Sequence, residues 1–173
     1  MKFLILFILV VLGTLMSGVY GGLQDQIAYT VSPEFFTKFR FQIMHIDPSV
    51  SGRWGAALVG FKSTWSVGLI LGGILSLSGY IHSKPSNMFH FTVHSFFIAL
   101  TCAFVFSMIG LAMGGEENDV TKNSQIIDKA HFQAVERMIN FSKMGGVIGM
   151  FLGIFYQLYR KKRIENITSP EKV

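Results

Sequence analysis

The sequence predicts an all-helical membrane protein that crosses the bilayer four times as one tightly packed helix bundle. Three observations support this fold class: half of the 173 residues are hydrophobic, only 14% are charged, and four apolar stretches are long. A soluble domain has about 25% charged residues, so this chain has too few to cover a soluble surface. Intrinsic disorder is excluded as well, because it requires low hydrophobicity and high charge. The single cysteine, Cys102, excludes an intramolecular disulfide and a zinc site made of cysteines alone.

The four spans are predicted where apolar stretches reach the length that a bilayer requires, about 20 residues. They belong to a single membrane domain over residues 1–173, with spans at about 3–20, 54–80, 91–113 and 141–159. The first stretch also has features of a cleavable signal peptide, because Lys2 provides a basic start. Its apolar run of about 18 residues is longer than the usual h-region of roughly 7–15, so we expect an uncleaved first span.

Basic residues predict the orientation of the spans, because cytoplasmic loops carry an excess of Lys and Arg. Four of them directly follow the fourth span and begin a tail at residues 160–173: Arg160, Lys161, Lys162 and Arg163. Both termini are therefore expected in the cytoplasm, with outer segments at about 21–53 and 114–140. The net charge of +5 reflects this orientation, and we expect no nucleic-acid partner. The expected location is a bacterial inner membrane.

The first outer segment is predicted to contain a short helix. The sequence Ser32-Pro33-Glu34 provides a hydroxyl N-cap, a proline at the first helical position and an acidic residue in the first turn. Phe35 and Phe39 then fall on one face of this helix. The helix either lies in the membrane interface or packs as a cap over the bundle, and the sequence leaves both alternatives open.

The second outer segment is predicted to lead directly into the fourth span. Gly114 and Gly115 end the third span, and apolar residues then recur at helical spacing from about residue 124. No Pro or Gly interrupts this pattern before the fourth span begins. We therefore predict one long helix from about 124 to 163, whose first turns stand outside the bilayer.

Small residues recur every four positions in all four spans, and this is the most specific pattern in the chain. Such residues let two helix backbones approach closely, which favours helix association in lipid. The four series are Gly13, Ser17 and Gly21; Ala56, Gly60, Thr64, Gly68, Gly72 and Ser76; Ser95, Ala99, Ala103 and Ser107; and Gly145, Gly149 and Gly153. They indicate packing within the chain, a subunit interface, or both.

The spacing of the second series also predicts which neighbours it contacts. A step of four residues turns a helix by about 400°, so each step drifts by about 40° around the helix. We therefore expect Gly60 and Gly68 to contact different helices, one nearer each end of the span.

Lys62 is the main candidate for a functional charge inside the membrane. It lies about eight residues into the second span, at a depth of about 12 Å. A charge at that depth costs several kcal/mol unless it is paired or reaches the surface. The expected partners are Glu116 and Glu117, just beyond the third span. The alternatives are a side chain extended to the headgroups, and an ion pathway or contact with an anionic ligand.

Two residue pairs are weaker candidates for ligand binding. His90 and His94 are four apart and share a helix face, which could hold a metal or haem. Asp128 and His131 are three apart and match half of a carboxylate-bridged metal site. Further ligands are missing from the sequence in both cases. We therefore expect interfacial histidines, a solvated helix face, and no cofactor or metal.

Nothing in the sequence points to catalysis. It contains neither Gly-x-Ser-x-Gly nor His-Glu-x-x-His nor a phosphate-binding glycine loop. Cys102 lies in the middle of an apolar span, where a thiol is expected to be inert. We therefore expect, in preference to an enzyme, a structural or accessory membrane protein that assembles with itself or as a small subunit of a larger complex. The alternative is a small transporter or channel-like protein that uses Lys62 and the acidic outer segment.

Overall fold

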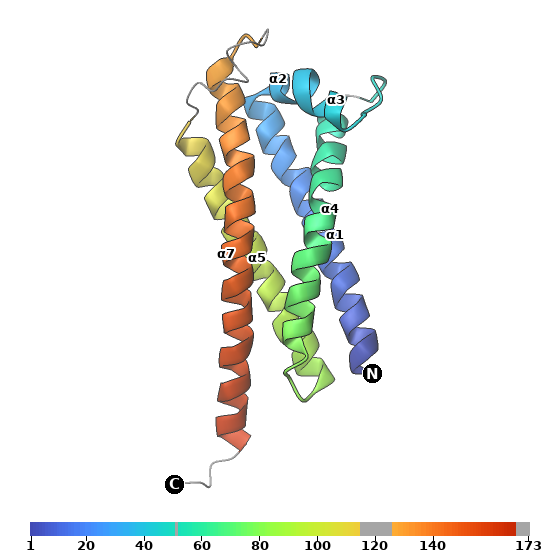
Figure 1. Ribbon diagram of the computed structural model, residues 1–173, viewed down its shortest axis with the longest axis vertical. Helices are drawn as coiled ribbons and strands as arrows, with labels where there is room; N and C mark the ends of the chain where they lie inside the picture. The colour runs from blue at the N-terminus through green and yellow to red at the C-terminus, as the bar shows by residue number, and fades with distance from the viewer. Residues whose placement is uncertain (51, 115–125, 169–173) are drawn as a thin grey trace.

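The computed structural model describes residues 1–50, 52–114 and 126–168, and within these ranges the protein is all-helical (Figure 1). Four helices are long and apolar enough to cross a membrane, as the sequence predicts. They are α1 (Lys2–Val31), α4 (Gly52–Gly79), α5 (Pro85–Ala112) and α7 (Lys129–Thr168). Between α1 and α4 the chain forms α2 (Pro33–Phe35), the π-helical turn η1 (Phe36–Arg40) and α3 (Phe41–Ile43).

The long helices run alternately in opposite directions (Figure 1). The N-terminus, the connection between α4 and α5, and the C-terminal end of α7 lie together, at what we call the terminal end of the bundle. The short elements α2, η1 and α3 lie across the opposite end, which we call the cap end. The N-terminus and the C-terminal end of α7 therefore lie on the same side of the bundle, as an even number of antiparallel long helices requires.

Helices α1 and α4 form a pair in which the two backbones are in contact. A Cβ atom added at Gly60 would meet the carbonyl oxygen of Gly21, and one added at Gly72 would lie 3.4 Å from the Cα of Gly13. Two hydrogen bonds also join the helices, because the hydroxyl of Ser17 donates to the Thr64 carbonyl (2.9 Å) and that of Thr64 to the Ser17 carbonyl (2.8 Å). Small residues are required along this contact because any larger side chain would separate the backbones.

The neighbours of Gly60 and Gly68 differ from the sequence-based expectation. Both glycines contact α1, the first at Gly21 and the second at Ser17. The expectation of two different neighbours was wrong because it assumed a partner parallel to α4. Rows of residues spaced four apart are inclined by about 26° to the helix axis, so a helix that crosses obliquely follows the row. Figure 1 shows α1 and α4 crossing in this manner.

Helices α5 and α7 form a second pair of the same kind. Added Cβ atoms at Gly145 and Gly149 would lie 2.6 Å from the Cys102 carbonyl oxygen and from the Ala99 Cα, respectively. Toward the terminal end, the hydroxyl of Ser95 donates to the carbonyl of Gly153 at 2.9 Å. The series in the third and fourth spans therefore face each other within one chain.

The two pairs join through a mixed interface. Large apolar side chains from all four long helices form one buried cluster: Leu9, Leu75, Met88, Phe96, Ala99 and Met150. Nearer the terminal end, the fully buried amide of Gln157 on α7 donates from Nε2 to the Leu75 carbonyl on α4, at 3.0 Å. Side chains, not direct backbone contact, thus hold one pair against the other.

Three helices differ in extent from the predicted spans. Helix α5 begins at Pro85, before the predicted start at about residue 91. Helix α1 continues beyond residue 20 to Val31, because Gln24 and Asp25 are buried against other helices although they lower the local hydropathy. Helix α7 is one long helix, as expected, and it has 40 residues, about 60 Å at 1.5 Å per residue. Residue 124, the predicted start, lies outside the described ranges, and the helix begins at Lys129.

The short helix expected after Ser32 packs on the bundle. The Ser32 hydroxyl accepts a hydrogen bond from the Phe35 N–H at 3.4 Å, as its predicted N-cap role requires. Phe35 and Phe36 are 3% and 0% exposed, and the Phe35 ring meets Phe132 of α7 edge-on at 5.0 Å. This geometry corresponds to the packed-cap alternative. Phe39, on the same face as Phe35, remains 39% exposed.

The contact between α1 and α4 predicts a difference between two glycines of α4. Gly60→Ala should lower stability by about 1–3 kcal/mol, because its Cβ would meet backbone atoms that cannot move aside. Gly73→Ala is the matched control, because a Cβ there has no atom within 4 Å. Melting temperatures of the purified variants in the same detergent compare the two. Equal melting temperatures would contradict the backbone contact.

Candidate functional site

The strongest candidate site is a group of buried polar side chains at the cap end. Gln24 and Asp25 on α1 are 5% and 4% exposed, although both are polar and one is ionisable. Burial of such groups costs free energy unless their hydrogen bonds are satisfied. Their neighbours therefore decide what this part of the bundle can do.

Gln24 takes part in a chain of three polar side chains. The Ser142 hydroxyl on α7 donates to Gln24 Oε1 at 2.9 Å. Because that hydrogen is used, the Tyr20 hydroxyl donates in turn to Ser142 Oγ, also at 2.9 Å. Tyr20 and Gln24 lie one turn apart on α1, so these hydrogen bonds with Ser142 join α1 to α7.

Asp25 interacts electrostatically with a cation from the short elements at the cap end, although no ion pair of 4 Å or less joins the two. Arg40, at the end of η1, interacts electrostatically with Asp25 and donates from Nη2 to the Ser63 hydroxyl of α4 at 2.7 Å. Asp25 Oδ2 and Arg40 Nε are buried without a hydrogen-bond partner. Buried polar atoms are nearly always paired, so water or a small polar ligand would complete the hydrogen bonding of each atom.

Sequence reasoning missed Asp25 and Arg40 because it placed both in an outer segment. A signal was nevertheless present, since the small-residue series of the first span ends at Gly21, and no proline follows before Pro33. Because the helix continues without a break through residue 31, Gln24 and Asp25 belong to α1 and are buried against other helices.

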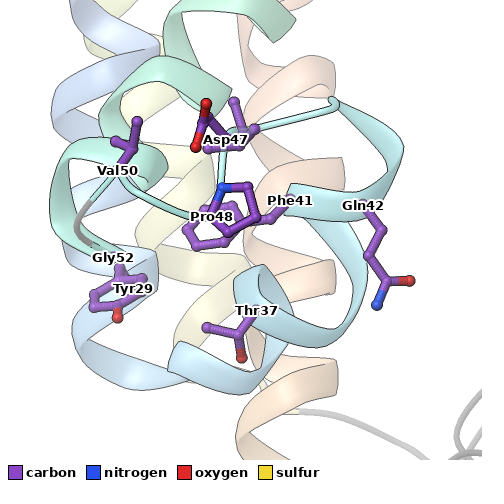
Figure 2. A pocket seen from close by; sticks show the side chains of 9 residues that line it. Tyr29, Thr37, Phe41, Gln42, Asp47, Pro48, Val50 and Gly52 are labelled. Atoms are coloured by element: carbon purple, nitrogen blue, oxygen red, sulfur yellow. The ribbon is translucent and has the colours of Figure 1, made fainter.

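A surface cavity of about 420 Å³ adjoins the cap (Figure 2). Its walls come from α1, the cap and the segment before α4, as Figure 2 shows for Tyr29, Phe41 and Pro48. Asp47 is the one acidic side chain among the residues that line it. Its carboxylate accepts the Ser49 N–H at 2.8 Å, which lowers its pKa and commits it to the local turn. The cavity therefore presents no pair of groups for acid–base chemistry.

The structure does not test the predicted Lys62 pairing, because Glu116 and Glu117 lie outside the described residues. Lys62 itself is exposed on the surface of α4. Among residues 1–50, 52–114 and 126–165, no ion pair includes it. The charges that the bundle encloses here are instead Asp25 and, half-buried, Arg40.

His90 and His94 lie together on the surface of α5. Their ring centroids are 4.3 Å apart, and the Nδ1–H of His94 donates to the His90 carbonyl at 2.8 Å. The His94 ring also stacks on Tyr156 of α7, with a centroid distance of 6.3 Å. Both histidines are exposed, so they face away from the buried polar groups.

Asp128 and His131 act locally at the start of α7. Asp128 accepts the backbone N–H of His131 at 3.1 Å, in the manner of an N-cap, and its second oxygen contacts His131 Nδ1 at 2.6 Å. These hydrogen bonds lower the pKa of Asp128. The Asp-x-x-His spacing thus matches a helix start. In the described part of the chain, no three His, Cys, Asp or Glu side chains form a group that could hold a metal.

Glu34 connects the cap to the same helix start. Its carboxylate accepts the N–H groups of Ile127 and Asp128, both at 3.1 Å, and pairs with Lys38 at 2.5 Å. The hydrogen bond from Lys38, followed by those from the backbone, lowers the pKa of Glu34. A carboxylate is favourable at the N-terminus of a helix, where N–H groups lack acceptors.

Comparisons of this chain with protein-family models, with curated proteins and with solved structures give no match. The geometry of the described residues is therefore the basis for the functional proposals.

The electrostatic interaction of Asp25 with Arg40 predicts a measurable coupling. Asp25→Leu should lower stability by about 1–2 kcal/mol, because the half-buried guanidinium loses a nearby negative charge but keeps its hydrogen bond to Ser63. Adding Arg40→Met should recover part of this loss, with a coupling energy of about 1–3 kcal/mol. Denaturant unfolding of the two single variants and the double variant in mixed micelles gives this energy. Strictly additive effects would show that the two side chains do not interact.

Proposed function

We propose that this chain is an integral membrane protein with a structural or accessory role, assembled with itself or as a small subunit of a larger membrane complex. One contrast carries the proposal: polar side chains lie between the helices, whereas large apolar side chains cover the outer faces of all four. Examples more than half exposed are Phe7, Ile70, Leu77, Phe97, Phe151 and Phe155. Such an apolar surface is unfavourable in water, so it favours contact with lipid or with another membrane protein.

The arrangement of polar groups supports a structural role over an enzymatic one. Ser142 and Gln157 use their hydrogen bonds to join the helix pairs, and Asp128 and Glu34 use theirs at the start of α7. His90 and His94 lie on the outer surface. We therefore assign no catalytic step to these residues.

A transport function is the second candidate. The buried Asp25 beside Arg40 favours it, since ionisable groups enclosed by membrane helices commonly mark ion or proton pathways. Lys62 and the acidic outer segment would contribute to such a pathway at the same end of the bundle.

The proposed orientation has both termini in the cytoplasm. Thr168→Cys, in a Cys102→Ala background, should resist a membrane-impermeant thiol reagent in intact cells, because position 168 follows the basic residues 160–163. Asp47→Cys is the matched control, since Asp47 is exposed at the cap end and its replacement should label readily. Rapid labelling at position 168 together with protection at position 47 would invert the topology.

The accessory role predicts that the chain co-purifies with itself or with a defined membrane partner. The measurement is extraction at native expression in a mild detergent, followed by size determination and mass spectrometry of the bound proteins. Lys62→Leu should recover the same assembly, because this exposed charge lies outside the helix contacts. An isolated monomer that carries an ion flux, lost in Lys62→Leu, would contradict the accessory role and support transport.

A further inference from the structure

A second cavity, of about 330 Å³, lies at the terminal end of the bundle. It is formed by the connection between α4 and α5, the first turn of α5 and the last turns of α7. Seven residues line it: His82, Ser83, Lys84, Asn87, Lys161, Ile164 and Glu165. The buried polar groups at the cap end are far from it, because they lie at the opposite end of the long helices (Figure 1).

Positive charge dominates this cavity and its surroundings. Lys84 and Lys161 line it, and Lys2 is close enough to influence His82 electrostatically. Nearby, the Arg160 guanidinium lies 4.8 Å from the centroid of the Phe91 ring. Glu165 is the one acidic residue in the lining, and its carboxylate is 3.7 Å from Lys161 Nζ. Such an exposed ion pair is weak, so an anionic ligand can replace it.

The first turn of α5 adds backbone donors to the same cavity. This helix of 28 residues begins at Pro85, and its N-cap, Lys84, makes no side-chain hydrogen bond to it. The first N–H groups of a helix have no acceptor within the helix, and they favour an anion together with the helix dipole. Asn87, in this turn, lines the cavity.

His82 provides an independent sign that this cavity receives a ligand. It is only 2% exposed, and its Nε2 atom is buried without a hydrogen-bond partner. The ring is held in place against Phe91, with a centroid distance of 4.9 Å. Burial, and then the positive charges of Lys161 and Lys2, lower the pKa of His82. An anion in the cavity would oppose this effect and supply an acceptor to the ring.

We propose that this cavity binds the phosphate group of an anionic phospholipid, between Lys84, Lys161, His82 and the first turn of α5. The inference rests on the proposed membrane location, which places the ends of the apolar helices at the level of the headgroups. Basic cavities between membrane helices on the cytoplasmic side are suited to anionic headgroups. An anionic membrane surface attracts the basic residues 160–163, which brings the adjoining cavity to the level of the headgroups and favours lipid over a soluble phosphate as its occupant.

Native mass spectrometry of the purified full chain in detergent, titrated with short-chain phosphatidylglycerol, tests this proposal. Wild type should bind phosphatidylglycerol at least tenfold more tightly than phosphatidylcholine, whose phosphate carries a compensating ammonium. Lys84→Gln with Lys161→Gln should weaken phosphatidylglycerol binding about tenfold or more, since hydrogen bonds from charged groups are strong. The matched control is Lys162→Gln with Arg163→Gln, which replaces two neighbouring cations.

This control removes the same charge from residues outside the cavity lining and should leave binding within twofold of wild type. Equal binding by wild type and the Lys84/Lys161 variant, or equal loss in both double variants, would overturn the site. Displacement of the lipid by inorganic phosphate at the same concentration would overturn the lipid assignment. If the double variant fails to fold, Lys84→Gln alone should still weaken binding several-fold. Lipid binding is measured on the purified chain and does not depend on co-purifying proteins. A negative result would therefore contradict the lipid site without contradicting the accessory role.

Discussion

Direct contact between helix backbones is the interaction on which the rest of this structure depends. In lipid, a leucine gains nothing by leaving the chains around it for another helix, so association must come from close packing and hydrogen bonds. The contacts of Gly21 with Gly60 and of Gly149 with Ala99 provide that closeness. Each occurs within one helix pair, α1 with α4 and α5 with α7. The small residues of these series are therefore used for packing inside the chain.

The two pairs are joined by a different kind of interaction. Polar side chains cross the boundary at both ends, Ser142 with Gln24 near the cap and Gln157 with the Leu75 carbonyl near the termini. A large apolar cluster fills the space between them. Polar contacts fix the relative position of two surfaces more closely than apolar packing does, because each donor needs one particular acceptor. The glycine contacts thus build the pairs, and the polar contacts set how the pairs meet.

The sequence predicts much of this architecture, because the helices follow from local patterns. Four apolar stretches, the N-cap at Ser32 and the unbroken pattern before α7 each depend on residues close together in the chain. The candidate site was harder to predict, since hydropathy averages over all faces of a helix. That average placed Lys62 within a span but could not say which face of the helix it occupies, and it left out Asp25, which is buried, whereas Lys62 is exposed on α4. Which face turns inward depends on the oblique crossing of α1 and α4, and this crossing is also why Gly60 and Gly68 share one neighbour.

The first N–H groups of a helix need hydrogen-bond acceptors, and the two ends of the bundle differ in how α7 and α5 meet this need. At the cap end, the N-terminus of α7 receives a carboxylate from the chain itself, because Glu34 accepts the N–H groups of Ile127 and Asp128. At the terminal end, α5 begins without a hydrogen bond from its N-cap side chain, and the cations Lys84 and Lys161 line the cavity at its first turn. A helix start needs acceptors in both places. The proposed phospholipid phosphate would supply such an acceptor at α5, beside Lys84, Lys161 and the unpartnered Nε2 atom of His82.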